Sequence, residues 1–229
     1  MIKGIVPASL IDWDGNICCV VFTGGCNYRC GFCHNPELID MNKTESMNED
    51  DILKIIDKKR KWVDGVCITG GEPLIHTEIK QFCGKIKSLG LKIKMDTNGS
   101  DPGFLMELIK EKLVDYIAVD IKSPKSKYKE ITGVNVDIDA VQKSIDIVMN
   151  SGVEYEFRTT FVPDVLKKED FIEIASWIKG AKRYFIQQFR PVNTYDRKYL
   201  EVEPCTIPEL EKIRGLIKDN FELCELRNL

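Results

Sequence analysis

The sequence contains no apolar run that approaches the ~18 uninterrupted residues a membrane helix needs. Residues 1–14 contain no apolar core long enough for a signal peptide. A Gly/Ser-rich linker, a low-complexity tract and a sequence repeat are also missing. We therefore predict no membrane association, a cytoplasmic location and one domain over 1–229. Its core would span about 16–190, with a C-terminal helix and strand over 204–229.

Charge and cysteine content narrow the class of protein further. A net charge of −3 and a pI near 5.6 give no indication of nucleic-acid binding. The densest basic run, Lys58–Lys61, falls at the end of a predicted helix, where it complements the negative pole of the helix dipole. Nine cysteines, an odd number without a regular framework, do not resemble a disulfide-stapled secreted domain. In a reducing compartment, clustered cysteines indicate metal or redox chemistry.

The chain alternates short apolar runs rich in β-branched residues with segments of helical period. The runs predict strands over 17–22, 66–69, 91–95, 116–119, 154–161 and 184–189, with a possible terminal strand over 223–226. The periodic segments predict helices over 77–89, 138–149, 171–178 and 207–216. Two more helices are indicated by caps: a Ser46–Glu49 capping box, and Asp101 before Pro102.

Six strand–helix repeats predict a parallel sheet with right-handed crossovers, which suits either a doubly wound sheet or a partial barrel. Glycines and polar residues follow the strands at 23–26, 70–73, 96–99 and 120–122, and Arg158, Gln187 and Gln188 also lie in or at the ends of strands. Barrel enzymes build their sites where the C-terminal ends of parallel strands meet. The sequence therefore favours an α/β fold, a partial (β/α)6 TIM-like barrel with one active face.

Cys26, Cys30 and Cys33 place three thiols within eight residues. Thiolates are soft ligands that suit zinc or iron–sulfur clusters. Either a distant residue completes a closed site, or one metal position stays open for a substrate. A zinc knuckle with His34 as fourth ligand would usually show a second cysteine pair, and an electron-transfer ferredoxin would need a fourth cysteine. Both stay open as alternatives.

The spacing C-x3-C-x2-C, with Phe32 before the last cysteine, resembles the signature of the radical S-adenosylmethionine (SAM) enzymes. The resemblance continues through GGEP at 70–73, DTNG at 96–99, DIK at 120–122 and RTTFVP at 158–163. The segment FTGGCNYRCGFCHNPEL at 22–38 is similar to the activating enzymes of glycyl-radical enzymes. Within these, the chain most resembles the longer form of the anaerobic ribonucleoside-triphosphate reductase activating protein.

The resemblance implies a single radical SAM domain with a [4Fe–4S] cluster on the three cysteines and a fourth iron that chelates SAM. Reductive cleavage of SAM then gives a 5′-deoxyadenosyl radical. It also implies contacts to SAM from ten further residues: Phe32, Gly70, Gly71, Glu72, Asp96, Asn98, Asp120, Lys122, Arg158 and Gln188. Glu72 would be the counter-charge of the SAM ammonium, and Lys122 and Arg158 would approach its carboxylate. A plain ion-pair cluster of Asp96, Asp120, Lys122 and Arg158 is the alternative for those four.

By the same resemblance, the radical would abstract a Cα hydrogen from one glycine of a large partner, most simply an anaerobic ribonucleotide reductase. A reduced flavodoxin- or ferredoxin-like protein would supply the electron. Related pyruvate formate-lyase activating enzymes carry a histidine near the sixth strand end, whereas Phe185–Phe189 has none, which favours the reductase subfamily. A pyruvate formate-lyase-like partner, another radical modification, and a zinc-binding interaction module remain the alternatives.

Overall fold

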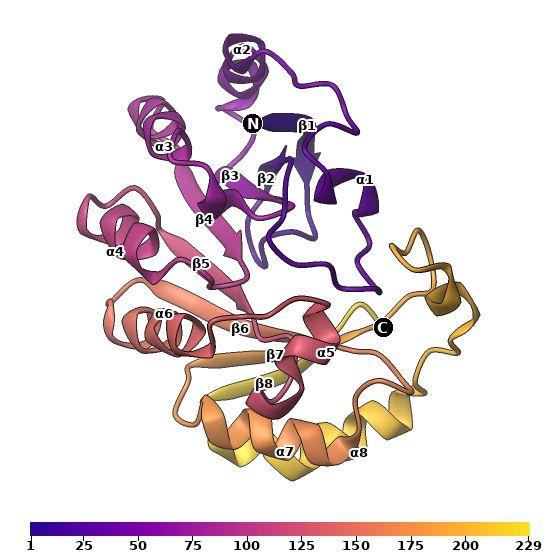
Figure 1. The fold of residues 1–229 in the computed structure, drawn as a ribbon. Helices are drawn as coiled ribbons and strands as arrows, with labels where there is room; N and C mark the ends of the chain where they lie inside the picture. Colours follow the sequence, from indigo (N-terminus) through magenta and orange to yellow (C-terminus); the bar gives the residue numbers. More distant parts are fainter.

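The computed structural model describes residues 1–229 and builds them around one eight-stranded sheet, hydrogen-bonded in sequence order (Figure 1). Strands β2 to β8 are parallel, and β1 runs antiparallel beside β2. The strands are β1 (Ile2–Ser9), β2 (Cys18–Thr23), β3 (Gly65–Gly70), β4 (Lys92–Thr97), β5 (Tyr116–Asp120), β6 (Glu154–Phe161), β7 (Arg183–Gln188) and β8 (Leu223–Arg227). Because β1 and β8 do not pair with each other, the barrel is open.

Six longer helices cover the outer side of the curved sheet in Figure 1. They are α2 (Glu49–Lys59), α3 (Ile79–Ser88), α4 (Pro102–Lys110), α6 (Ile138–Asn150), α7 (Lys168–Trp177) and α8 (Ile207–Ile217). The connections contain the short helices α1 (Pro36–Ile39) and α5 (Tyr128–Thr132), and single turns η1 (Pro73–Ile75), η2 (Lys125–Lys127), η3 (Arg197–Glu201) and η4 (Lys218–Asn220). None of these helices has the length and apolar character that crossing a membrane requires.

Successive side chains along each strand point to opposite faces of the sheet, and both faces are buried. On β3, Val66 and Ile68 belong to the main core between the sheet and the helices, while Cys67 points to the inner face of the barrel. There Cys67 packs in a small cluster with Trp13, which comes from the loop between β1 and β2. The inner face is thus mixed: this small apolar cluster lies beside Lys94, which pairs in register with Cys67, and further charged side chains are described below.

The predicted parallel strands and outer helices are confirmed to within a few residues, including the terminal strand, which adds a seventh parallel strand as β8. The cap by Asp101 is also confirmed, since its carboxylate accepts the Phe104 N–H at 2.9 Å. One strand, β1, was not predicted. Gly4 and Pro7 interrupt its pattern, and proline is tolerated here because β1 is an edge strand.

The predicted Ser46–Glu49 capping box is wrong. Asn48 is the N-cap of α2, and its side-chain oxygen accepts the N–H groups of Asp50 at 2.9 Å and Asp51 at 3.4 Å. The Ser46 hydroxyl instead accepts a hydrogen bond of 3.0 Å from the Lys3 ammonium. Asparagine is as good an N-cap as serine, so the local chemistry of the helix start is unchanged although the residue differs.

Candidate active site

A cavity of about 350 Å³ lies where the C-terminal ends of the parallel strands meet. The structure brings every predicted site residue to this one cavity: Cys26, Cys30, Phe32, Cys33, Gly70, Gly71, Glu72, Asp96, Asn98, Asp120, Lys122, Arg158 and Gln188. These residues come from the ends of β3, β4, β5, β6 and β7 and from the loop after β2. Residues far apart in sequence therefore share one hollow because parallel strands end at the same edge.

The loop that carries the three cysteines is fixed by backbone hydrogen bonds to three other parts of the chain. Gly25 N–H donates to the Leu38 carbonyl at 2.7 Å, which ties the loop to α1. Arg29 N–H donates to the Thr132 carbonyl at 2.7 Å, at the end of α5. The Gly31 carbonyl accepts the Asp196 N–H at 2.8 Å, from the segment before η3. The positions of the thiols are therefore set by tertiary structure.

The donor set of this loop fits an iron–sulfur cluster. No group of three His, Cys, Asp or Glu side chains is arranged around a point that one metal ion could occupy. A [4Fe–4S] cluster gives each cysteine its own iron, so the three thiols need to line one hollow without meeting at a point. Burial raises the pKa of Cys26 to about 11 and that of Cys30 to about 12. The positive charge of bound iron would lower these pKa values and allow the buried cysteines to bind as thiolates.

His34 does not complete a zinc site. Its Nε2 lies 2.8 Å from the Arg190 carbonyl, and its ring stacks on Phe189 at 5.5 Å between centroids. The imidazole therefore joins the cysteine loop to the segment after β7. His34 is therefore not the fourth ligand that a zinc site would need.

Gly70 and Gly71 allow the turn after β3 to pack directly on the cysteine loop. Gly70 has φ +124°, a left-handed conformation that side chains rarely adopt, and a Cβ on Gly71 would lie 1.9 Å from the Gly25 carbonyl oxygen. The Glu72 N–H donates to the same Gly25 carbonyl at 2.8 Å. Close approach of backbone to backbone is thus the structural reason for both glycines, in addition to any approach of a ligand.

Glu72 is 1% exposed and joins the GGEP turn to the DTNG turn. Its Oε1 accepts from the Thr97 hydroxyl at 2.6 Å, and its Oε2 accepts the Asn98 N–H at 2.7 Å. Burial raises the pKa of Glu72 to about 7, although these hydrogen bonds act in the opposite direction. The Asn98 side chain in turn donates to Asn27 at 2.8 Å, so the carboxylate is part of a network that reaches the cysteine loop.

The four charged residues in or just after β4, β5 and β6 form the ion-pair cluster that the sequence offers as an alternative. Arg158 donates from Nε to Asp120 at 2.9 Å and from Nη1 to Asp96 at 3.0 Å. Lys122 lies 3.0 Å from Asp120. Burial alone raises the pKa of Asp120, but the charges of Arg158 and Lys122 outweigh it and hold that pKa below its usual range. All four also line the cavity, so the ion-pair role and a ligand-binding role are geometrically compatible.

The inner face carries two further charged residues that the sequence analysis missed. Lys94 is 1% exposed and pairs with Asp96. Glu156 is 2% exposed, lies 3.7 Å from Arg158 and accepts from Arg227 at 2.7 Å. Both stand two residues before a predicted site residue on the same strand, and side chains at that spacing share a face of the sheet. This spacing is the signal that could have identified them.

Two buried polar atoms at the cavity have no hydrogen-bond partner, the Tyr28 hydroxyl and Gln188 Oε1. The Gln188 amide nitrogen is bound to the Cys205 carbonyl, which leaves only the oxygen free. Phe32 is buried and contacts Tyr199 edge-on, with 6.1 Å between ring centroids. A buried polar atom without a partner is costly, and both of these side chains also line the cavity.

Comparisons with known proteins identify the family and support the fold. Residues 20–178 match the sequence model of the Radical SAM superfamily. Over its whole length the chain is 34% identical to a protein of Methanocaldococcus jannaschii that carries the provisional name glycyl-radical enzyme activating enzyme, 96% of which is covered. It is 29% identical to the pyruvate formate-lyase-activating enzyme of Clostridium pasteurianum, with 92% of each chain covered.

Among solved structures, the chain resembles Streptococcus suis SuiB bound to S-adenosylmethionine, with a TM-score of 0.70 and 17% identity. The match covers 90% of this chain and 49% of SuiB, so the chain spans about half of that protein, and the likeness supports the fold. The chain belongs to the radical SAM superfamily, whose enzymes bind a [4Fe–4S] cluster and SAM. Within it, the full-length relatives are named as activating enzymes of glycyl-radical enzymes.

Proposed function

We propose that the chain holds a [4Fe–4S] cluster on Cys26, Cys30 and Cys33 and uses SAM to form a glycyl radical on a large partner enzyme. The partner we favour is an anaerobic ribonucleoside-triphosphate reductase. A reduced flavodoxin- or ferredoxin-like protein would supply the electron. The observation that carries the proposal is the cavity itself, which is lined by the three cysteines together with all ten further residues expected from the resemblance.

When bound, the reduced cluster and SAM supply a 5′-deoxyadenosyl radical. The side chains of the cavity bind and orient the cofactor. Lys122 and Arg158 would offer positive charge to the SAM carboxylate, and Glu72 negative charge to its ammonium. Phe32 would pack near the adenine, and Asp120 would contact the ribose or methionine part. Asp96, Asn98, Gly70, Gly71 and Gln188 complete the proposed SAM contacts.

A glycine is a suitable target for this chemistry. Its α-radical is stabilised by the flanking amide groups, and the missing side chain leaves the Cα hydrogens open to approach. The target segment of the partner would have to enter the hollow at the C-terminal ends of the strands. This step is inferred from the architecture alone.

A pyruvate formate-lyase-like partner is the second candidate, and one observation favours it. The relative from Clostridium pasteurianum, named for that activity, is similar over 92% of both chains. The absence of histidine from Phe185–Phe189 favours the reductase instead.

Electron paramagnetic resonance (EPR) spectroscopy of anaerobic mixtures tests the proposal. The reconstituted chain, SAM and dithionite are incubated with either a reductase or a pyruvate formate-lyase-like enzyme. We expect a glycyl-radical doublet with the reductase, and none with Cys30→Ala or with a partner whose target glycine is alanine. A doublet only with the pyruvate formate-lyase-like enzyme would select the second candidate. SAM cleavage without a radical on either enzyme would contradict activation of both.

A further inference from the structure

A second hollow, of about 360 Å³, adjoins the site cavity, and we call it the Cys26 hollow. Cys26 and Ile39 line both hollows. Neither Cys30 nor Cys33 lines the second one. Cys26 therefore forms part of the wall between the site cavity and a separate opening on the surface, on the side of α1.

Reduction of a cluster in this loop needs an electron from outside the chain. The other six cysteines are scattered along the sequence and contain no second closely spaced triplet. The electron carrier must therefore approach the loop across the protein surface. The Cys26 hollow offers such an approach because one of its walls is a cysteine that would ligate the cluster.

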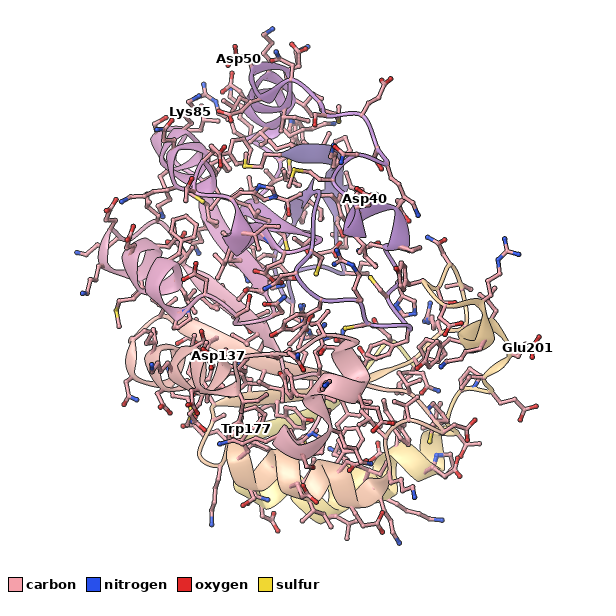
Figure 2. The ribbon with its side chains drawn as sticks, in the orientation of Figure 1. Asp40, Asp50, Lys85, Asp137, Trp177 and Glu201 are labelled. Carbon is pink, nitrogen blue, oxygen red and sulfur yellow. The ribbon has the colours of Figure 1, made fainter.

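Three apolar side chains lie on the rim of the Cys26 hollow. Met41 after α1, Ile75 in η1 and Tyr195 before η3 all line it, and each is between 40% and 45% exposed. Together they bring apolar surface from three separate parts of the chain to one opening. Asp40 lies at the end of α1 and Glu201 lies in η3, and Figure 2 shows these two residues on the same side of the molecule.

The charges of the rim are mainly positive. Arg29 and Lys43 are exposed and form no ion pair, and Asp40 is the one carboxylate among the lining residues. The Arg29 guanidinium donates to the Cys26 carbonyl at 2.5 Å, so this positive charge is attached to the cysteine loop itself. A rim that combines apolar side chains with two cations that form no ion pair suits a small, transient contact with an acidic protein.

The basic run Lys58–Lys61 is a stronger patch of charge but lies at the wrong end of the barrel. It begins in the last turn of α2 and precedes β3, whose six residues lead to the cavity. At ~3.3 Å per residue this strand separates the run from the cysteine loop by roughly 20 Å. Lys61 therefore supplies a matched control for a charge that is exposed but distant.

We propose that the Cys26 hollow is the docking site of an acidic one-electron carrier, a protein with flavin or iron–sulfur redox chemistry. The proposal rests on the function proposed above. At this contact the reduced carrier would give one electron to the cluster held by Cys26, Cys30 and Cys33, which would pass from the +2 to the +1 state without any covalent bond forming or breaking. Docking is governed by Lys43, Arg29 and the apolar rim.

The test uses the full chain with a reconstituted cluster, an acidic flavodoxin as the probe, and three variants: Lys43→Glu, Met41→Glu and Lys61→Glu. Binding of oxidised flavodoxin is measured by isothermal titration calorimetry at low and high salt. We expect Lys43→Glu to raise the Kd about threefold to tenfold at low salt and to weaken its salt dependence. Met41→Glu raises the Kd at both salt concentrations, while Lys61→Glu matches the wild type.

A second readout is 5′-deoxyadenosine formation, driven either by reduced flavodoxin or by dithionite. We expect both hollow variants to lose rate with flavodoxin and to keep the wild-type rate with dithionite. Equal effects of Lys43→Glu and Lys61→Glu, or unchanged flavodoxin binding, would overturn the docking site. Normal flavodoxin binding with impaired glycyl-radical formation under dithionite would assign the hollow to the partner enzyme instead. Wild-type protein that cleaves no SAM under dithionite would refute the proposed function separately.

Discussion

Thr97 and Glu72 form a hydrogen bond of 2.6 Å between two buried side chains, and this bond joins the turns after β3 and β4. The same Thr97 hydroxyl accepts the Gly99 N–H at 3.1 Å. Thr97→Val keeps the shape of the side chain and removes the hydroxyl. We expect it to lower the free energy of unfolding by about 1–3 kcal/mol, because it leaves buried polar groups unpaired.

Urea unfolding under anaerobic conditions measures this loss. Thr97→Ser retains the hydroxyl and is expected to stay closer to the wild type than Thr97→Val. Equal stability of the valine variant and the wild type would contradict the role given to this hydrogen bond.

The raised pKa of Glu72 predicts a pH dependence of stability. A carboxyl whose pKa rises from its ordinary value of 4.5 to about 7 on folding binds its proton more tightly in the folded state. The free energy of unfolding should therefore fall as pH rises through this window, by about 3 kcal/mol for this group. Glu72→Gln removes that contribution, so its stability should fall less between pH 4.5 and 7 than that of the wild type.

Urea titrations at several pH values compare the two proteins. Glu173→Gln, at an exposed position of α7, should keep the wild-type dependence. If Glu72→Gln follows the wild-type curve at every pH, Glu72 does not titrate in the expected window.

Removing the Arg158 guanidinium should strongly destabilise the protein. Arg158→Met removes the partner that Asp96 and Asp120 share, in positions that are 12% and 28% exposed. Lys94 and Lys122 remain as their single partners, so we expect a loss of up to about 3 kcal/mol, below the full cost of a broken buried pair. Denaturation with urea should show this loss. Lys54→Ala, at an exposed pair with Asp51, should be indistinguishable from the wild type. A small effect of Arg158→Met would show that the cluster is well solvated.

Gly71→Ala should damage the site through the backbone. The added Cβ would lie 1.9 Å from the Gly25 carbonyl oxygen, so the GGEP turn and the cysteine loop must move apart. We expect lower stability and less iron bound per chain after reconstitution. The matched control is Gly84→Ala in α3, where nothing lies within 4 Å and alanine should stabilise the helix by about 0.5–1 kcal/mol. Normal iron content in Gly71→Ala would contradict the close contact.

The parts of the site that the sequence predicted are those with local signals. Strands with apolar runs are recognisable one at a time, and each is followed by glycine or polar residues, as in Gly70–Pro73 after β3. Parallel topology then gathers these strand ends without further information. The cysteine spacing is likewise local, whereas the ten further residues came from the resemblance to a known family, and all of them line the cavity.

The missed features depend on tertiary structure. In the run Lys92–Thr97, alternating lysines suggest a solvated face, yet Lys92 is exposed and Lys94 is buried beside Asp96. Only the curvature of the sheet makes that face internal. The segment 190–206 has no helical or strand period, but it contacts the cysteine loop through Asp196 and Tyr199 (Figure 1). No pattern in the sequence indicates those contacts.

We propose that Cys26, Cys30 and Cys33 hold a redox-active cluster that binds SAM. EPR of the anaerobically reconstituted, reduced protein, recorded with and without SAM, examines the cluster and SAM binding together. We expect a [4Fe–4S]⁺ signal that changes shape when SAM is added and is absent from Cys30→Ala. A protein that carries zinc instead, or a cluster whose spectrum is the same with and without SAM, would contradict it.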